Sequence, residues 1–368
     1  MTFEFKFIDE HHIDQCIGLL RSFFGPNYYG ADKKYVAWQY RDSIFKTTLA
    51  GKDEYSILAA MKGNEILALD AFLPWKTMVN GQAVTTIWDI EWLNAAKIRG
   101  IGRALVQALR SMGDIYCGYG LNSLSRTAYD KLGYSIRDHI ERKIAFLDGK
   151  TCMSLFSTEG DKKKDDFIAS HTVDLFNIPY CIIQDVSNIA DTYWINQLER
   201  FDCVSYKGVD YLQWRFINHP YLTYYIIALD ERAEHGLAVV RPEKIKGHRE
   251  IVLRILDMLP VPGCEHDLAR AVITFGKKNG AILADYFCAS AKYADCVCPE
   301  PFISFSEHVH YDIPMLFQPI EVRERKSINM VMDCSEKYKH MSFENFFATK
   351  ADSDQDVYLN EDYKTVLI

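Results

Sequence analysis

The chain has 368 residues, of which 48% are hydrophobic and 25% charged, and its formal net charge is −8. This composition is typical of a globular protein with enough apolar material for two domains, and the negative charge disfavours a general nucleic-acid binder. No apolar run is long enough to span a membrane. The ten cysteines form no CxxC pair and no signal peptide opens the chain, so we expect reduced thiols in a cytoplasmic protein.

The first 148 residues contain a regular series of strands and helices. Apolar alternation and turn residues define the strands, while capping residues and glycines define the helix ends. The predicted series is strand 3–8, helix 9–24, helix 32–45, strands 55–61, 65–79 and 85–93, helix 102–112, strand 114–122, helix 123–132 and strand 135–147.

A glycine turn joins the strand at 85–93 to the helix at 102–112. Its sequence is Lys97-Ile98-Arg99-Gly100-Ile101-Gly102-Arg103-Ala104. The glycines let the backbone approach a ligand closely, and the helix that follows offers unpaired N–H donors and the positive end of its dipole. Three cationic side chains lie in the same turn. The turn therefore predicts a binding site for an anionic group such as a pyrophosphate. It lacks the Gly-Lys-Ser/Thr of a P-loop and the third glycine of a dinucleotide fingerprint.

The turn resembles the acyl-CoA signature of the GNAT acetyltransferase superfamily, Gln/Arg-x-x-Gly-x-Gly/Ala, with Lys97 in the first position. A second segment, Asn122 followed by Tyr129-Asp130-Lys131-Leu132-Gly133-Tyr134, resembles the superfamily's Asn…Tyr-x-x-x-Gly-Phe/Tyr segment. Both motifs stand in the expected order within residues 1–148. The resemblance implies an α/β (α+β) fold with a mixed, mostly antiparallel sheet flanked by helices, and acetyl-CoA (CoA) as the cofactor.

The second half of the chain repeats the first in a degenerate form. The matching segments are 35–40 with 211–216, 88–94 with 254–260, 102–112 with 268–278, and 114–122 with 281–289. Where the first copy has its glycines, the second has Glu265-His266-Asp267, whose acids would repel a pyrophosphate. We therefore predict two tandem GNAT folds: residues 1–148 with the acetyl-CoA site, a charged connecting loop over 149–166, and a degenerate GNAT-like domain with a C-terminal tail over 167–368.

The resemblance assigns roles to residues near the turn. Backbone N–H groups around Trp92 and Leu93 would hold the thioester between two strands that separate near Asn94 and Asn122. Asn122 would contact the cofactor, the alternative being a role in the local turn. Tyr129 stands where the superfamily has its general acid, and a phenol with a pKa of about 10 can protonate a leaving thiolate. The alternative for Tyr129 is aromatic packing.

Two acids precede the glycine turn. Asp89 and Glu91 are two residues apart on a predicted strand, so they share one face unless a bulge intervenes. Burial between apolar neighbours would raise the pKa of either carboxyl toward that of a useful base. We predict that one of them is the catalytic base, directly or through water, with Glu91 preferred. The alternative is that the acid only pairs with a neighbouring element.

Several residues are candidates for the acceptor site. Trp38 and Arg41 lie on the helical segment that borders the acceptor pocket in GNAT proteins, although Trp38 also suits the core. His308, His310 and Asp312 alternate, which predicts one polar face of a strand that contacts the acceptor or only solvent. A fourth ligand is missing there, so we predict no metal site.

The chain's last stretch includes acids over 349–356, either a solvated tail or a lid over a cationic acceptor. With the segment 211–220 it resembles tandem GNAT proteins of bacterial surface-polysaccharide synthesis. The prediction is an N-acetyltransferase that acts by direct attack of a primary amine, an amino sugar either free or nucleotide-linked, with no nucleic-acid or membrane partner. The alternatives are a Fem-type aminoacyl transferase, which the glycine turn disfavours, and a non-catalytic acyl-CoA sensor or scaffold. The sequence leaves the oligomeric state open.

Overall fold

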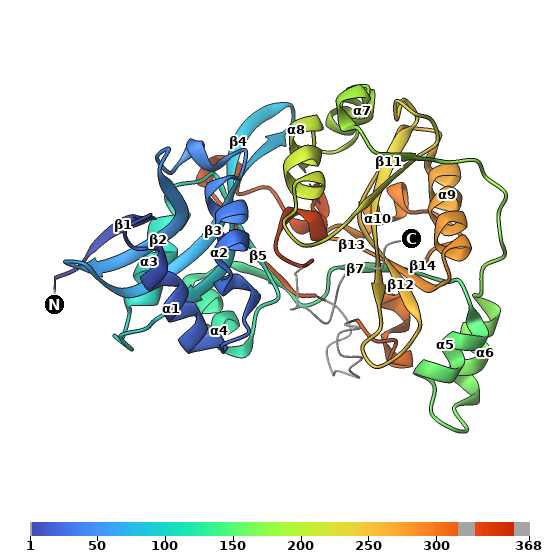
Figure 1. The fold of residues 1–368 in the computed structure, drawn as a ribbon, viewed down its shortest axis with the longest axis horizontal. Helices are drawn as coiled ribbons and strands as arrows, with labels where there is room; N and C mark the ends of the chain where they lie inside the picture. The colour runs from blue at the N-terminus through green and yellow to red at the C-terminus, as the bar shows by residue number, and fades with distance from the viewer. Residues whose placement is uncertain (1, 316–327, 357–368) are drawn as a thin grey trace.

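The computed structural model describes residues 2–315 and 328–356. Two mixed β-sheets, each flanked by helices, lie side by side along the long axis of the molecule (Figure 1). None of the described helices combines the length and the apolar character needed to cross a bilayer. All ten cysteines are free thiols, as the sequence analysis expects.

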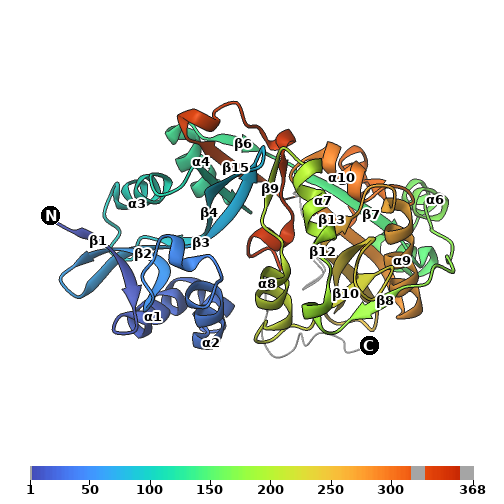
Figure 2. The same ribbon diagram turned by 90° about the horizontal axis from the view of Figure 1, so that it is seen from above.

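Along the main path of the first sheet, β4 and β5 pair in parallel and the other neighbouring strands pair antiparallel. Helices α1 (Ile13–Phe24) and α2 (Lys33–Val36) cover one face, and α3 (Ile101–Arg110) and α4 (Ser123–Leu132) cover the other (Figure 2). The strand order is β1 (Glu4–Asp9), β2 (Glu54–Lys62), β3 (Glu65–Val79), β4 (Gln82–Leu93), β5 (Ile115–Tyr119), β15 (Met330–Cys334) and β6 (Ser135–Arg137), with β9 (Cys203–Ser205) beside β3 and β16 (Phe346–Phe347) beside β9.

The second sheet has a similar plan, with a parallel pair between β12 and β13. Its flanking helices are α7 (Thr192–Arg200), α8 (Val209–Leu212), α9 (Glu265–Lys278) and α10 (Ala291–Val297). The strand order is β14 (Ile303–Ser304), β7 (Glu141–Phe146), β13 (Ala281–Cys288), β12 (Ile251–Pro260), β11 (Gly236–Lys244), β10 (Tyr225–Ala228) and β8 (Cys181–Ile183).

The two sheets exchange strands across the predicted boundary at residue 148. β7 comes from the first half but pairs with β13 in the second sheet, and β15 returns from the second half to pair with β5 in the first. The predicted strand 135–147 is therefore two strands in different sheets. All six residues of β7 are buried. Each half thus supplies the antiparallel neighbour that the central strand of the other half lacks.

The predicted charged loop at 149–166 is wrong, because this stretch forms α5 (Gly149–Phe156) and most of α6 (Lys162–Ser170). Asp148 and Asp161 accept hydrogen bonds from backbone N–H groups three residues on, as N-caps do. The charged side chains that suggested a loop lie mainly on the outer face of α6, while Phe167 and Ile168 are buried.

The two halves share local irregularities. A π-helical turn follows α2 at Ala37–Arg41, and another follows α8 at Gln213–Ile217. The pairing of β3 with β4 is interrupted by a bulge, and so is the pairing of β11 with β12. Trp38 and Trp214 meet where the halves join, and the indole N–H of each donates to the backbone carbonyl of the other, at 3.0 and 3.1 Å. Trp38 therefore packs in the core.

Candidate active site

A cavity opens where β4 and β5 separate. Their pairing runs from Thr86–Ile115 to Asp89–Gly118 and then ends, while β4 continues beside β3 to Leu93. The cavity has a volume of about 560 Å³ and reaches both faces of the sheet. Its lining is Phe23, Phe24, Tyr28, Asp89, Ile90, Glu91, Trp92, Leu93, Asn94, Gly118, Tyr119, Gly120, Leu121, Asn122, Leu124, Ser125, Tyr129 and Asp354.

A bulge at Ile90 separates the two acids of β4. Ala71 pairs with Glu91 and the next residue, Phe72, pairs with Asp89, so Ile90 has no partner on β3. Neighbours on β3 face opposite sides, and the acids therefore do so as well. Asp89 lies on the α3 and α4 side, and Glu91 on the α1 and α2 side. The shared face predicted in the absence of a bulge is not formed.

The glycine turn has the conformation that the sequence predicts. Gly100 has a φ of 88°, in the left-handed region, and directly precedes α3. The Asn94 side chain holds the turn, since it accepts from the Ile98 N–H and donates to the Ile98 carbonyl. Within the described residues, the N–H groups of Gly100, Gly102 and Arg103 have no acceptor. Lys97, Arg99 and Arg103 are exposed around them. The turn thus offers free donors and positive charge to an anion.

Gly102 is needed for packing. A β-carbon at this position would lie 2.8 Å from Cζ3 of Trp92, closer than side chains tolerate. Trp92, which is partly buried, therefore rests on the first turn of α3 at the cavity wall. The close approach that the sequence analysis assigned to a ligand is made here by the protein's own indole.

Asp89 is the centre of a buried polar network. The hydroxyl groups of Tyr116 and Tyr129 both donate to its Oδ2, and the two hydroxyls lie 3.1 Å apart. Burial raises the pKa of Asp89, although the two tyrosines oppose the shift, and burial together with Asp89 raises the pKa of Asp70 well above its usual value. Burial likewise raises the pKa of Tyr129, so its phenol remains protonated.

Glu91 is a buried acid with one free oxygen. Tyr28 donates to Oε1, whereas Oε2 has no hydrogen-bond partner within the part of the chain that the structure describes, and the residue is only 7% exposed. Burial raises its pKa to about 8; the Tyr28 hydrogen bond opposes this shift and the negative charge of Asp354 adds to it. A carboxyl with this pKa can accept a proton near neutral pH.

The C-terminal segment, residues 349–356, is buried between the two halves and does not form a solvated tail. Asp352 pairs with Lys207 and Asp356 with Arg241, and all four side chains are at most 3% exposed. Asp354 lies between them in sequence and lines the cavity near Glu91, where it accepts from Tyr29 at 3.3 Å. Residues 357–368 of the predicted tail lie outside the described residues.

The structure brings Asp89, Glu91, Trp92, Leu93, Asn122 and Tyr129 to one cavity. Asn122 also caps α4, because its Oδ1 accepts from two backbone N–H groups at 2.9 Å. The remaining turn residues surround the nearby start of α3. The predicted roles of these residues in catalysis and cofactor binding stay predictions.

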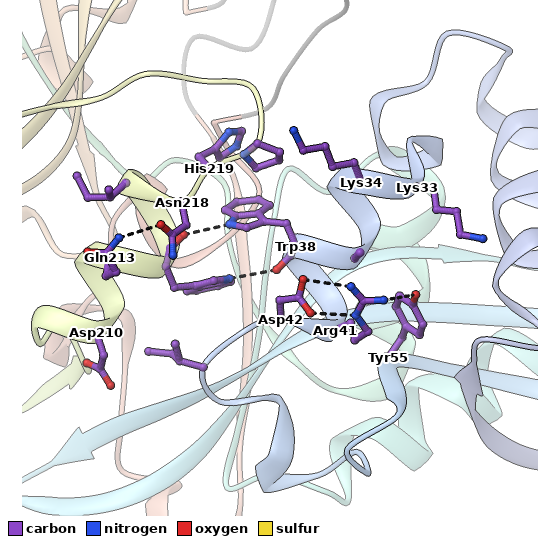
Figure 3. A pocket seen from close by; sticks show the side chains of 15 residues that line it. Lys33, Lys34, Trp38, Arg41, Asp42, Tyr55, Asp210, Gln213, Asn218 and His219 are labelled. Carbon is purple, nitrogen blue, oxygen red and sulfur yellow. Dashed lines mark hydrogen bonds and ion pairs between the residues drawn. The ribbon is translucent and has the colours of Figure 1, made fainter.

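Four other candidates lie elsewhere. Trp38 and Arg41 line a separate cavity of about 1060 Å³ at the junction of the halves (Figure 3). Arg41 is held there by Asp42 and Glu10.

His308 and His310 lie in a 3₁₀ segment, Ser306–Tyr311, and not on the predicted strand. His308 packs against Phe167 of α6. These histidines do not line the cavity at β4 and β5. The described residues include no cluster of metal-ligating side chains.

Sequence reasoning missed Tyr28, Asp70 and Tyr116, and it named Asp354 only as one of several acids in a solvated tail or a lid. Asp70 had a usable signal, because an acid inside the apolar run of a long central strand must be compensated or neutral. Asp354 had a weaker one, the alternation of acids at 352, 354 and 356. Tyr28 and Tyr116 carry no local signal, since only the fold brings their hydroxyls to Glu91 and Asp89.

The chain shares its fold with solved acyltransferase structures. A GCN5-related N-acetyltransferase from Anabaena variabilis matches with a TM-score of 0.58 and 12% identity, over 92% of this chain and 74% of that one. The corresponding protein from Kribbella flavida gives 0.54 and 13%, over 90% and 72%. Saccharomyces cerevisiae N-myristoyltransferase with bound myristoyl-CoA gives 0.50 and 11%, over 94% and 84%. The likeness confirms the predicted α/β fold class. No family model and no curated protein matches the sequence.

Proposed function

We propose that this protein is an acyl-CoA-dependent N-acyltransferase that transfers an acetyl group to a primary amine. The observation that carries the proposal is the cavity at the separation of β4 and β5. It adjoins a turn with free N–H donors on one side and holds buried carboxyls of raised pKa on both faces. The shared fold is consistent with this chemistry.

The turn residues fit the anionic part of an acyl-CoA. The N–H groups of Gly100, Gly102 and Arg103 would receive the pyrophosphate, and the side chains of Lys97 and Arg99 would neutralise it. Trp92 and Leu93 would flank the pantetheine arm, with Asn122 at the facing strand end. Bound acyl-CoA supplies an acyl group activated as a thioester.

The two acids of β4 have separate roles in this proposal. The amine nitrogen forms a bond to the acyl carbon, the carbon–sulfur bond breaks, and Glu91 accepts the proton that the amine loses. Tyr129 gives a proton to the departing thiolate. Asp89 acts as a positioning residue, because it holds the Tyr129 hydroxyl. The phenol regains its proton from solvent after the products leave.

We assign the second half to a degenerate copy of the same fold. Both halves have a central parallel pair of strands and a π-helical turn. In both, a bulge interrupts the antiparallel pairing of the first strand of that parallel pair. In the second half, Glu265 and Asp267 lie in the first turn of α9, where α3 carries the glycine turn. The CoA site is therefore assigned to the first half alone. The acceptor is proposed to be an amino sugar of a cytoplasmic bacterial glycan pathway, on the sequence resemblance.

Calorimetric titration with CoA, followed by thiol release from acetyl-CoA, tests the proposal. We expect the double variant Arg99→Glu/Arg103→Glu to weaken CoA binding at least tenfold, because two exposed cations at the turn become anions. Lys62→Glu, an exposed charge reversal at the end of β2, is the matched control and should bind CoA normally. Failure of the unaltered protein to bind CoA would contradict the proposal. Binding without turnover on glucosamine, nucleotide-linked amino sugars, polyamines or peptides would favour the sensor.

A further inference from the structure

The described residues that line the cavity include acids but no lysine or arginine. Within residues 2–315 and 328–356, Glu91 Oε2 has no hydrogen-bond partner although the side chain is buried, and Asp354 lines the same cavity. Among the described residues, neither acid has an ion-pair partner. Tyr35 adds a third polar group, because its buried hydroxyl also has no hydrogen-bond partner among the described residues. Buried polar groups without partners are rare in native proteins unless a ligand completes them.

The second half contains an equivalent set of groups. Asp257 is the first paired residue after the bulge of β12, as Glu91 is on β4. Tyr211 is the third residue of α8, as Tyr35 is the third residue of α2. Lys207 directly precedes the N-cap of α8, and the residue before the N-cap of α2 is Ala31. At this position the second half therefore has a lysine where the first half has an alanine.

In the second half the lysine completes the set. Lys207 Nζ lies 2.9 Å from Asp257 Oδ2 and 2.9 Å from Asp352 Oδ1, and all three side chains are fully buried. The Tyr211 hydroxyl donates to Asp257 Oδ2 at 2.9 Å. One primary ammonium group thus satisfies an acid of the sheet and an acid of the C-terminal segment at once.

In the first half, no lysine among the described residues pairs with the corresponding acids, Glu91 and Asp354. Glu91 takes the place of Asp257, and Asp354, from the same C-terminal segment as Asp352, lies beside it. Ala31 offers only a methyl group where Lys207 extends its chain. The space between Glu91 and Asp354 adjoins a cavity that opens to solvent, whereas the site around Lys207 is closed. An ammonium group supplied from outside would restore the missing pairing.

We propose that the acceptor enters as a primary ammonium ion and binds between Glu91 and Asp354, in the place that the Lys207 ammonium fills in the second half. Asp354 is thereby a specificity residue of the acceptor site. The inference rests on the proposed function and narrows its substrate class. Because both acids are anionic when an ammonium is bound, amines with an adjacent carboxylate, such as α-amino acids, are excluded by repulsion. Once bound, the ammonium gives one proton to Glu91, which releases it to solvent through the open cavity. The neutral amine then attacks the acyl carbon, and the ionised Glu91 accepts the second proton that the nitrogen loses.

Binding of defined amines tests this assignment without turnover. The probes are putrescine and glucosamine, with 1,4-butanediol and N-acetylglucosamine as their neutral counterparts and glycine as the zwitterion, each titrated into the CoA-loaded protein. We expect the two amines to bind and the other three not to. Equal binding of the neutral compounds, or no amine binding in a protein that binds CoA, would overturn the inference. Failure to bind CoA would instead overturn the proposed function.

Variants locate the site. Asp354→Asn and Glu91→Gln should each weaken amine binding at least tenfold and leave CoA binding unchanged, while Asp130→Asn, an exposed acid on α4, should change neither. Unchanged amine affinity in Asp354→Asn would contradict the assignment. Ala31→Lys would place an internal ammonium in the space between Glu91 and Asp354 and should abolish amine binding; a folded Ala31→Lys protein that still binds amines would also contradict it. If that buried substitution prevents folding, the Asp354→Asn result decides.

Discussion

Glu91 and Asp89 show how one inserted residue divides chemistry between two faces of a sheet. The bulge at Ile90 turns Glu91 toward Tyr28 and Asp354, and leaves Asp89 with Tyr116 and Tyr129. Without the bulge the acids would lie side by side and compete for one proton. In the proposed mechanism, this separation lets Glu91 act as the base on one face of the sheet while Asp89 holds Tyr129 on the other.

Glu91 also links folding to pH. Burial raises its pKa from 4.5 to about 8, so the folded protein binds this proton more tightly than the unfolded chain does. The contribution of the protonated Glu91 carboxyl to the free energy of unfolding is fully present below about pH 4.5, and it is lost as the pH rises through about 8. We expect the free energy of unfolding to decline from about pH 5 to about pH 8.5, and to decline less in Glu91→Gln. Asp70 and Asp89 are common to both proteins, so the difference isolates Glu91.

Urea unfolding of the two proteins at both pH values measures this effect. An exposed control, Glu65→Gln, should keep the pH dependence of the unaltered protein, because that carboxyl is solvated in both states. The same pH dependence in Glu91→Gln and the unaltered protein would show that Glu91 is ionised in the fold at neutral pH.

The elements that define the cavity were predictable to different degrees. The strand, glycine turn and helix around residues 85–112 follow from local patterns, and the structure has them within a few residues. The C-terminal segment did not follow, because its acids match a solvated tail equally well in sequence. Only the cations brought to it by the second half, Lys207 and Arg241, decide that Asp352 and Asp356 are buried.

The pairing of the C-terminal segment with the second half supports the cavity wall. Lys207→Met would leave Asp257 and Asp352 buried without a counter-charge, and removal of one partner from a buried ion pair destabilises by about 3–5 kcal/mol. We expect a loss of that size in the free energy of unfolding, measured in urea. Lys339→Met removes only an exposed pair with Glu336 and should change stability by less than about 0.5 kcal/mol. Equal effects of the two substitutions would contradict the buried pairing.

The whole molecule is held together by exchanged strands. β7 and β15 each complete the sheet of the opposite half, and Trp38 and Trp214 hydrogen-bond to each other across the junction. Sequence patterns predicted both sheets but assigned residues 135–147 to one strand, because apolar alternation does not reveal which sheet a strand joins. They also gave 149–166 as a loop, since a charged outer helical face looks like a linker.

Strand exchange predicts that the halves do not fold separately. A fragment of residues 1–148 lacks β15 and leaves the buried strand β7 without its sheet. We expect this fragment to be unfolded or aggregated, as judged by circular dichroism and amide NMR, while the full chain unfolds in one cooperative transition. A fragment with dispersed, native-like amide signals would show that the exchanged strands are dispensable.

In the proposed acyl transfer at this cavity, Glu91 accepts the amine's proton. The most direct test is the rate of thiol release from acetyl-CoA with a saturating amine, compared between the unaltered protein and Glu91→Gln across pH. We expect kcat/KM of the unaltered protein to rise with pH through about 8, as Glu91 ionises. We also expect Glu91→Gln to lose this rise and to be slower by about 100-fold, with CoA affinity unchanged. Equal rates and equal pH profiles in the two proteins would contradict this role of Glu91.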